Sequence, residues 1–373
     1  MLLFLHHDPA PLNILSALCI LSTWPPYSSD AIVLDNPWQW IGMAIRLAIQ
    51  LHLHENETYS RLEQPGRARR IWWYLFINDT MQTACCGRPG MFPLDTSVPL
   101  PVPADFKNPD LGSHVFCHFA DLCKKLRRVL DLARTDNTPS EQVYLNLKEL
   151  RIWREQLPLD LQLFDVGTRQ PYNRAIAELY IFYLVTVIIT CFLSRRDNPS
   201  LFKYASLVAS SCASRLYEEI LYHEDVQYLL PIHAWAILVA GIPRAFSDSD
   251  ALNPERADEL RISKLVLETL SEKHSSAIVV LSKINSLGNL RADAFPAHAE
   301  PVWENSHVST SDEQVEIALL FPFPSSFCPM LELLKATDHN ENSSFATLPT
   351  LSMDGNDWPV DWSFFLFDDS ISL

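Results

Sequence analysis

Residues 38–53, WQWIGMAIRLAIQLHL, and residues 67–86, RARRIWWYLFINDTMQTACC, decide the fold class of this chain. In the first segment apolar residues recur at spacings of three and four, at Ile41, Ile45, Ala48 and Ile49. In the second segment one helical face carries Trp72, Phe76, Asp79 and Thr83. This periodicity predicts two amphipathic helices, and Gly87-Arg88-Pro89-Gly90 ends the second of them.

The same periodicity along the chain predicts an all-α, multi-helix fold. The predicted helices span 12–24, 38–53, 67–86, 114–134, 140–156 with Ser140 as its cap, 171–193, 200–222, 226–240 and 254–286. Between residues 91 and 109 prolines are too dense for a helix or a central strand, so we expect an extended proline-rich loop that packs on the protein. Periodicity fades after about residue 291. We therefore predict a helical regulatory domain over 1–290 and a low-order, disordered C-terminal tail over 291–373.

Charge and cysteine content limit the function. The net charge is −16 over 373 residues, and duplex binding depends on cationic side chains that neutralise phosphates. We therefore expect that this chain alone does not bind duplex DNA specifically. The 8 cysteines include no Cys-x-x-Cys pair, and most lie in apolar runs, as free cysteines of a reduced compartment do.

One apolar segment has to be weighed as a membrane helix. Residues 179–193 form a run of fifteen residues without a charged side chain. A helix that crosses a bilayer needs about 20 apolar residues. We therefore expect a buried helix here and no membrane partner.

The sequence carries no enzyme signature. A Gly-x-Ser-x-Gly elbow, a phosphate-binding glycine loop, a His-Glu-x-x-His pair and a calcium loop are all missing. We predict a protein that is not an enzyme, with no catalytic, cofactor-binding or metal-binding residues in this chain. His52, His54 and Glu55 do cluster, but residues two apart on a helix point to different faces and do not easily share a metal. The favoured interpretation is a helix end with polar residues that enter a loop.

Two basic clusters have alternative interpretations. Arg69-Arg70-Ile71-Trp72-Trp73 combines residues found in nucleic-acid platforms, but the helical face around Trp72 favours a core helix entered by a basic turn. Lys124-Lys125-Leu126-Arg127-Arg128 lies in an amphipathic segment, where Leu122, Leu126, Val129 and Leu130 would be buried. The basic side chains of that run would then stay in water, with a nuclear import signal as the alternative.

Three separated pieces of one pattern occur in order between residues 42 and 106. They are Gly42-Met43-Ala44-Ile45-Arg46-Leu47-Ala48 leading to His54, then Arg69-Arg70-Ile71-Trp72-Trp73 with Asp79 and Gly87-Arg88-Pro89, and finally Asp95, Val98 and Leu100-Pro101 with Asp105-Phe106. Together they resemble the middle homology region of fungal zinc-cluster transcription factors, and weaker likeness continues to about residue 290. The resemblance implies a helical regulatory domain with these scaffold residues: Gly42, Arg46, Ala48, His54, Arg69, Arg70, Trp72, Trp73, Asp79, Gly87, Arg88, Pro89, Asp105 and Phe106.

The resemblance also implies partners and a cofactor. Proteins of that family normally begin with six cysteines that hold two zinc ions and place a helix in the major groove. This chain supplies no such cysteines and begins within the first helices of the regulatory domain, so zinc is implied only if an upstream cysteine cluster exists. The implied protein is nuclear, regulates RNA polymerase II transcription, meets DNA only through that N-terminal module, and binds coactivators or the transcription machinery.

Three points stay open beside that implication. A homodimer is one alternative for the assembly. An adaptor that lacks a DNA-binding module and acts through protein partners is the alternative function. Residues 21–25, Leu-Ser-Thr-Trp-Pro, also resemble a stretch of the activators of secreted-protease genes.

The last residues have their own composition. Beyond Lys335 there is no Lys or Arg, and residues 336–373 carry seven acidic and six aromatic side chains. Acidic and bulky apolar residues mixed in this way are typical of activation segments. The candidate activation residues are Trp358, Asp361, Trp362, Phe364, Phe365 and Phe367. A tail without activity is the alternative.

The two deciding helices each carry one charge in a mostly apolar stripe. Arg46 lies on the first stripe and Asp79 on the second, and a charge within a core face needs a partner. We predict that these two residues pair. The alternatives are that either reaches water, or that Asp79 pairs with Arg88.

Overall fold

The computed structural model describes residues 10–23, 36–92, 96–134, 138–193, 199–245, 253–293, 316–331 and 334. These residues belong to two compact units, Met1–Leu130 and Asp131–Leu373. The regular elements of the described part are helices apart from one two-stranded hairpin, so the all-α prediction is confirmed. The 1–290 domain boundary stays a prediction.

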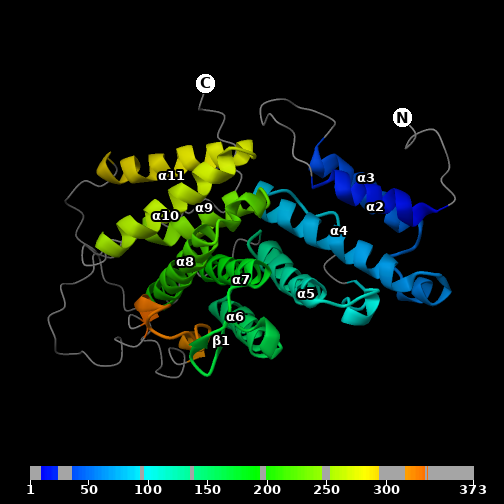
Figure 1. Ribbon diagram of the computed structural model, residues 1–373, viewed down its shortest axis with the longest axis horizontal. Helices are drawn as coiled ribbons and strands as arrows, with labels where there is room; N and C mark the ends of the chain where they lie inside the picture. Colours follow the sequence, from blue (N-terminus) through cyan, green and yellow to red (C-terminus); the bar gives the residue numbers. More distant parts are fainter. Residues whose placement is uncertain are drawn as a thin grey trace. The chain divides into compact units, whose positions relative to one another are not determined.

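The first unit is built from four helices in the described residues. They are α2 (Pro11–Leu21), α3 (Pro37–Gln50), α4 (Pro65–Cys86) and α5 (Leu111–Leu132), with the short 3-10 turns η1 (Asn56–Arg61) and η2 (Pro103–Asp105). α2, α3 and α4 pack against one another, as the blue and light-blue ribbons of Figure 1 show. Both 3-10 turns pack on α4, which makes this helix the spine of the unit.

Local chemistry sets where these helices begin and end. The Asn36 side chain accepts the Gln39 amide at 3.0 Å, and Pro37 follows in the first turn, where its missing N–H costs nothing. Asp110 caps α5 by accepting the Ser113 amide at 2.8 Å, while the Ser113 hydroxyl accepts the Asp110 amide at 2.9 Å. α4 ends at Gly87, whose φ of 63° lies in the left-handed region that favours glycine.

The second unit surrounds one apolar helix, α7 (Arg174–Phe192). Its other helices are α6 (Ser140–Glu155), α8 (Pro199–Tyr222), α9 (Ile232–Ala245), α10 (Asn253–Ser271) and α11 (Ser275–Asp293), with the 3-10 turns η3 (Leu159–Leu161), η4 (Asp225–Tyr228) and η6 (Pro329–Leu331). Helices α6, α8 and α9 all contact α7, which is green in Figure 1. Among the described residues α7 alone is long and apolar enough to cross a membrane, yet 83% of its most apolar window is buried. The predicted buried helix is therefore confirmed.

Three features of the second unit differ from the prediction. The single helix expected over 254–286 is two helices, because the chain turns at Glu272-Lys273-His274 between α10 and α11. The helix expected from residue 226 begins only at Ile232, after η4 and Pro231. A hairpin of β1 (Phe164–Asp165) and β2 (Thr168–Arg169) pairs Phe164 with Arg169 around Val166-Gly167, both at positive φ.

Part of the predicted low-order tail also packs into the second unit. Within residues 316–331, Phe321 is 1% exposed and Cys328 is fully buried. Tyr183 of α7 donates a hydrogen bond to the Leu320 carbonyl at 3.0 Å. The prediction of low order over 291–373 therefore does not describe this stretch, whose short apolar groups complete the core around α7.

Candidate functional site: the buried centre of the motif region

Asp79 of α4 is the centre of a buried polar cluster in the first unit. Its two carboxylate oxygens accept the Met91 amide at 3.0 and 2.9 Å, and one of them accepts the Phe92 amide at 3.0 Å. Arg127 of α5 donates from Nη1 to the same oxygen at 3.0 Å, and only 4% of either side chain is exposed. The carboxylate therefore joins α4, α5 and the loop after α4.

Arg127 completes this cluster with its remaining donors. Nη2 donates to the Phe92 carbonyl at 3.1 Å, and Nη1 lies 3.4 Å from the Thr83 hydroxyl. Thr83 donates in turn to the Asp79 carbonyl at 2.8 Å. A buried charge is tolerated when it is paired and its hydrogen-bonding capacity is filled, and this pair meets both conditions. The cluster can hold a loop in place, and it presents no group to solvent.

Gly90 is the residue that lets the guanidinium enter. A Cβ built on Gly90 would lie 1.7 Å from Arg127 Nη1, far inside van der Waals contact. Any side chain at this position would therefore push the guanidinium away from Asp79. The need for glycine here comes from the close approach, since its φ is not positive in the structure.

This cluster corrects two predictions from the sequence. The prediction that Arg46 pairs with Asp79 is wrong. The Arg46 side chain is exposed, and the cation that pairs with Asp79 is Arg127. The alternative partner, Arg88, is exposed as well and lies over the Trp38 ring, 4.9 Å from its centroid. The prediction that the whole basic run 124–128 stays in water is also wrong, because Arg127 is buried. Leu122, Leu126, Val129 and Leu130 are buried as predicted.

A second cluster fixes the start of α4 to the proline-rich loop. Arg69 Nη1 lies 2.6 Å from an Asp105 oxygen, and the other carboxylate oxygen accepts the Val102 amide at 3.0 Å. The Arg70 guanidinium lies over the Phe106 ring at 4.7 Å from its centroid. Two pairs of motif residues that lie at least 35 positions apart in the sequence are thus neighbours: Arg69-Arg70 and Asp105-Phe106.

Aromatic side chains complete the attachment of these loops. Trp73 donates from Nε1 to the Pro99 carbonyl at 2.8 Å, and Trp72 packs edge-on against Phe92 at 4.6 Å between ring centroids. Trp72 and Trp73 are 1% and 0% exposed, so neither offers a face on which a base could stack. The core-helix interpretation of this segment is confirmed, together with the buried face of Trp72, Phe76, Asp79 and Thr83.

Tyr59 anchors the segment that precedes α4. Its hydroxyl donates to the Leu53 carbonyl at 2.7 Å, and burial raises the pKa of Tyr59 well above its usual value. The group therefore stays a neutral donor at every physiological pH. Gly42 and Ala48 are buried in α3, His54 is half-buried, and Gly87, Arg88 and Pro89 are exposed after α4. The role of the motif residues as a scaffold stays a prediction.

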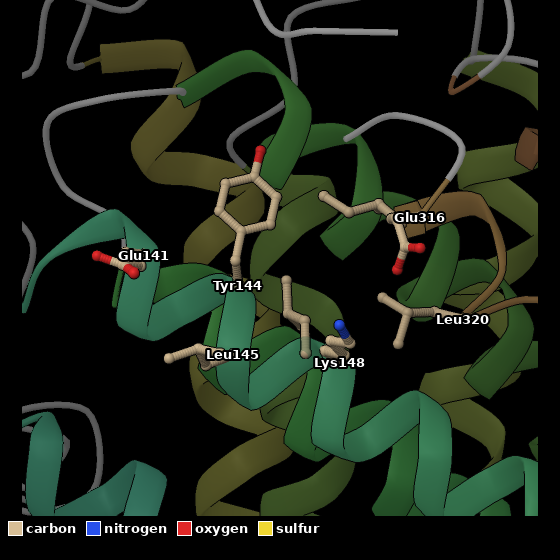
Figure 2. Close-up of a pocket in the computed structure, with 8 residues that line it drawn as sticks. Glu141, Tyr144, Leu145, Lys148, Glu316 and Leu320 are labelled. Atoms are coloured by element: carbon tan, nitrogen blue, oxygen red, sulfur yellow. The ribbon is translucent and has the colours of Figure 1, made fainter. Parts of the chain in front are cut away.

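The second unit contains a small open groove between α6 and the segment around residue 317. It has a volume of about 260 Å³ and is lined by Glu141, Tyr144, Leu145, Leu147, Lys148, Glu316, Ile317 and Leu320. Figure 2 shows Lys148 and Leu320 near one end and Tyr144 between that end and Glu141. Arg151 holds Glu316 through a contact of 2.6 Å. The groove is slightly smaller than the roughly 300 Å³ at which pockets for drug-sized ligands begin.

The candidate activation residues lie outside the described residues. This applies to Trp358, Asp361, Trp362, Phe364, Phe365 and Phe367, and also to Asp95 of the motif.

The sequence analysis did not single out Arg127 as a functional residue. Arg127 follows Leu126 directly and lies five residues after Leu122, which places it at the edge of the buried stripe of its helix. The signal that could have led to Arg127 was the need of a buried Asp79 carboxylate for a cationic partner.

Residues 3–155 match the family model of the fungal specific transcription factor domain. The chain is 25% identical over 238 residues to an acetamidase regulatory protein of Aspergillus oryzae, covering 58% of this chain and 29% of that protein. It is 32% identical over 194 residues to the Emericella nidulans protein of the same name, covering 44% and 24%.

A more distant relative has a different name. The thiamine repressible genes regulatory protein thi1 of Schizosaccharomyces pombe is 24% identical over 185 residues, covering 44% of this chain and 23% of that protein. The matches thus span less than a third of the length of these curated relatives. No solved structure matches the chain.

Proposed function

We propose that this chain is the regulatory region of a fungal transcription factor that works in the nucleus on RNA polymerase II transcription. The observation that carries the proposal is the match of residues 3–155 to the fungal specific transcription factor domain. Relatives named as regulatory proteins support it. The motif residues support it as well, because they are used to fix loops to α4 and present no arrangement suited to catalysis among the described residues.

DNA contact in this proposal belongs to a separate module. The chain has a net charge of −16, whereas a DNA-binding surface must neutralise phosphates with Lys and Arg. A binuclear zinc cluster of six cysteines is the module that the resemblance implies. A mobility-shift assay with purified 1–373 tests this division. We expect no sequence-selective retention of a duplex, and salt-sensitive retention of one defined site would contradict it.

The proposed effector segment is 336–373. Its seven acidic residues repel one another, and no Lys or Arg is present to pair with them. Six aromatic side chains then stay available to a coactivator surface, on which such segments fold. This composition supports activation over repression.

Tethering to a heterologous DNA-binding domain tests the regulatory and the effector parts separately. We expect reporter activity from 1–373 and from 336–373, and strongly reduced activity from 1–335. In 336–373, replacing Trp358, Trp362, Phe364 and Phe365 with alanine should abolish activity. Replacing Leu348, Leu351 and Met353, which lie outside the aromatic cluster, is the matched control and should preserve it.

The outcomes separate the proposals. Activity of 336–373 that survives the aromatic replacement contradicts the activation segment but leaves the regulatory region in place. Failure of 1–373 to change the reporter in either direction contradicts the regulatory function itself. Transcripts that encode no cysteine cluster upstream of this chain would favour the adaptor. The resemblance of residues 21–25 to activators of secreted-protease genes stays a prediction, and Trp24 and Pro25 lie outside the described residues.

A further inference from the structure

The end of α3 has an unusual residue at a position that glycine normally takes. The Leu53 amide donates to the Ala48 carbonyl at 3.0 Å, and the His52 amide donates to the Ile49 carbonyl at 2.9 Å. These two bonds form a Schellman motif, in which the residue after the cap adopts the left-handed conformation. That residue is His52, with a φ of 57°. A side chain in this conformation is strained, and such strain concentrates at functional sites.

The left-handed turn brings three ligand-type side chains together. His52 Nδ1 lies 3.0 Å from Glu55 Oε1, and His54 Nε2 lies 3.3 Å from the same oxygen. The two imidazole rings are stacked, with centroids 6.0 Å apart and planes inclined by 22°. The expectation that these histidines face apart assumed a continuing helix. Because α3 ends at Gln50, that assumption is wrong here.

We propose that His52, His54 and Glu55 bind a divalent transition-metal ion of the zinc class, with water completing a tetrahedron. One ligand atom from each residue lies within 4.8 Å of the other two. In tetrahedral zinc sites the bonds of about 2.0–2.1 Å hold ligand atoms roughly 3.4 Å apart. The measured separations of 3.0 and 3.3 Å from Glu55 Oε1 to the two histidine nitrogens are close to that value.

The ligand set selects the kind of metal. Two imidazoles and one carboxylate are a known ligand combination for zinc, with a fourth position left open to water. Two imidazole ligands make binding of Mg²⁺ or Ca²⁺ unfavourable here, because these ions prefer oxygen ligands. The side chains of His52, His54 and Glu55 are 65%, 38% and 50% exposed, so an ion has direct access from solvent.

The backbone that carries the ligands is fixed on both sides of His54. Leu53 is 1% exposed, and its carbonyl accepts the Tyr59 hydroxyl at 2.7 Å. The His54 carbonyl accepts the Ser97 hydroxyl at 3.0 Å. The backbone that carries the ligands is thus ordered before the ion arrives, which lowers the cost of binding. A bound ion would add a cross-link between the end of α3 and the turn that leads to η1.

Metal titration of the untagged 373-residue chain tests the site. We expect one Zn²⁺ per chain by calorimetry, and Co²⁺ in place of Zn²⁺ should give the visible absorption bands of a tetrahedral ion. His52→Gly is the informative variant, because glycine relieves the left-handed strain and so preserves the fold. His52→Gly should weaken Zn²⁺ binding by about 100-fold, because loss of a direct ligand costs at least as much as loss of a residue that hydrogen-bonds to a ligand. Excess Zn²⁺ should raise the melting temperature of the wild type and not of His52→Gly.

Other metal-binding residues require controls. Cys85→Ser with Cys86→Ser removes the two cysteines that are not fully buried, and His6→Ala with His7→Ala removes the adjacent histidines near residue 1. His223→Ala removes an exposed histidine far along the chain. All three variants should bind as the wild type does, whereas His54→Ala and Glu55→Gln should lose affinity. Absence of stoichiometric binding, binding unchanged in His52→Gly, or Co²⁺ spectra with sulfur charge-transfer bands would each overturn the proposal.

Discussion

Arg127 and Asp79 meet at 3.0 Å although 48 residues separate them, and 4% of each side chain is exposed. Asp79 also accepts the amides of Met91 and Phe92. This pair therefore differs from an ion pair that only neutralises charge. It satisfies the backbone of a loop that would otherwise leave buried donors without partners.

Removing one member of the pair should destabilise the first unit strongly. We expect Arg127→Met or Asp79→Ala to cost about 3–5 kcal/mol, because a buried charge or two buried amides lose their partners. Urea unfolding gives this value, and hydrogen exchange should show faster exchange of the Met91 and Phe92 amides. Lys124→Ala, one turn earlier in α5, is the control and should change stability little. Equal stability of Asp79→Ala and Lys124→Ala would contradict the assignment.

A single methyl group at Gly90 should have much the same effect as loss of Arg127. The added Cβ would lie 1.7 Å from Arg127 Nη1, so the guanidinium has to leave Asp79. In contrast, a Cβ on Gly42 meets its nearest atoms at 3.6 Å, which is ordinary contact. Gly42→Ala in the interior of α3 should therefore be neutral or stabilise by about 0.5–1 kcal/mol. Thermal unfolding of both variants checks the contrast, and equal melting temperatures would be the contrary result.

The segment around Phe321 should contribute to the stability of the second unit. Phe321 is 1% exposed, so Phe321→Ala should cost about 3–5 kcal/mol through lost contacts and a cavity. The nearby Leu319 is 43% exposed, and Leu319→Ala should cost little. Denaturant unfolding of the two variants measures the difference. If both are as stable as the wild type, residues 316–331 do not belong to the core.

Cys86 should be the most reactive thiol of the described residues. A hydrogen bond from Cys85 lowers the pKa of Cys86 to about 7, with Arg88 acting in the same direction against the effect of burial. Burial raises the pKa of Cys191 far above this range. The alkylation rate at Cys86 should rise as the pH increases through about 7, because the thiolate is the nucleophile. Peptide mapping after iodoacetamide treatment identifies the residue, and Cys85→Ala, which removes the donor, should move the midpoint to higher pH.

The sequence predicts the elements better than it predicts the polar contacts. Helix periodicity and Gly87-Arg88-Pro89-Gly90 are local signals, and they placed α3 and α4 within a few residues. The need of Asp79 for a partner was also visible. The choice between Arg46, Arg88 and Arg127 depends on how α5 packs, and sequence spacing does not contain that information.

Turns without glycine or proline were the other source of error. Nothing in Glu272-Lys273-His274 marks the break between α10 and α11, because these residues all have adequate helix propensity. At His52 the chain likewise adopts the left-handed conformation without a glycine. In both places tertiary packing outweighs local preference, and the consequence at His52 is a cluster that helix geometry would have kept apart.

Helix α7 has a consequence for the synthesis of the protein. Its 19 residues satisfy the length and hydropathy of a membrane span, and only burial in the second unit hides them. Several of the elements that cover α7 come later in the chain: α8, α9 and the segment that includes Phe321. A newly made α7 therefore leaves the ribosome before its cover exists. During that interval the chain should need a chaperone, and variants that delay folding of the second unit should appear first as aggregated or wrongly targeted protein.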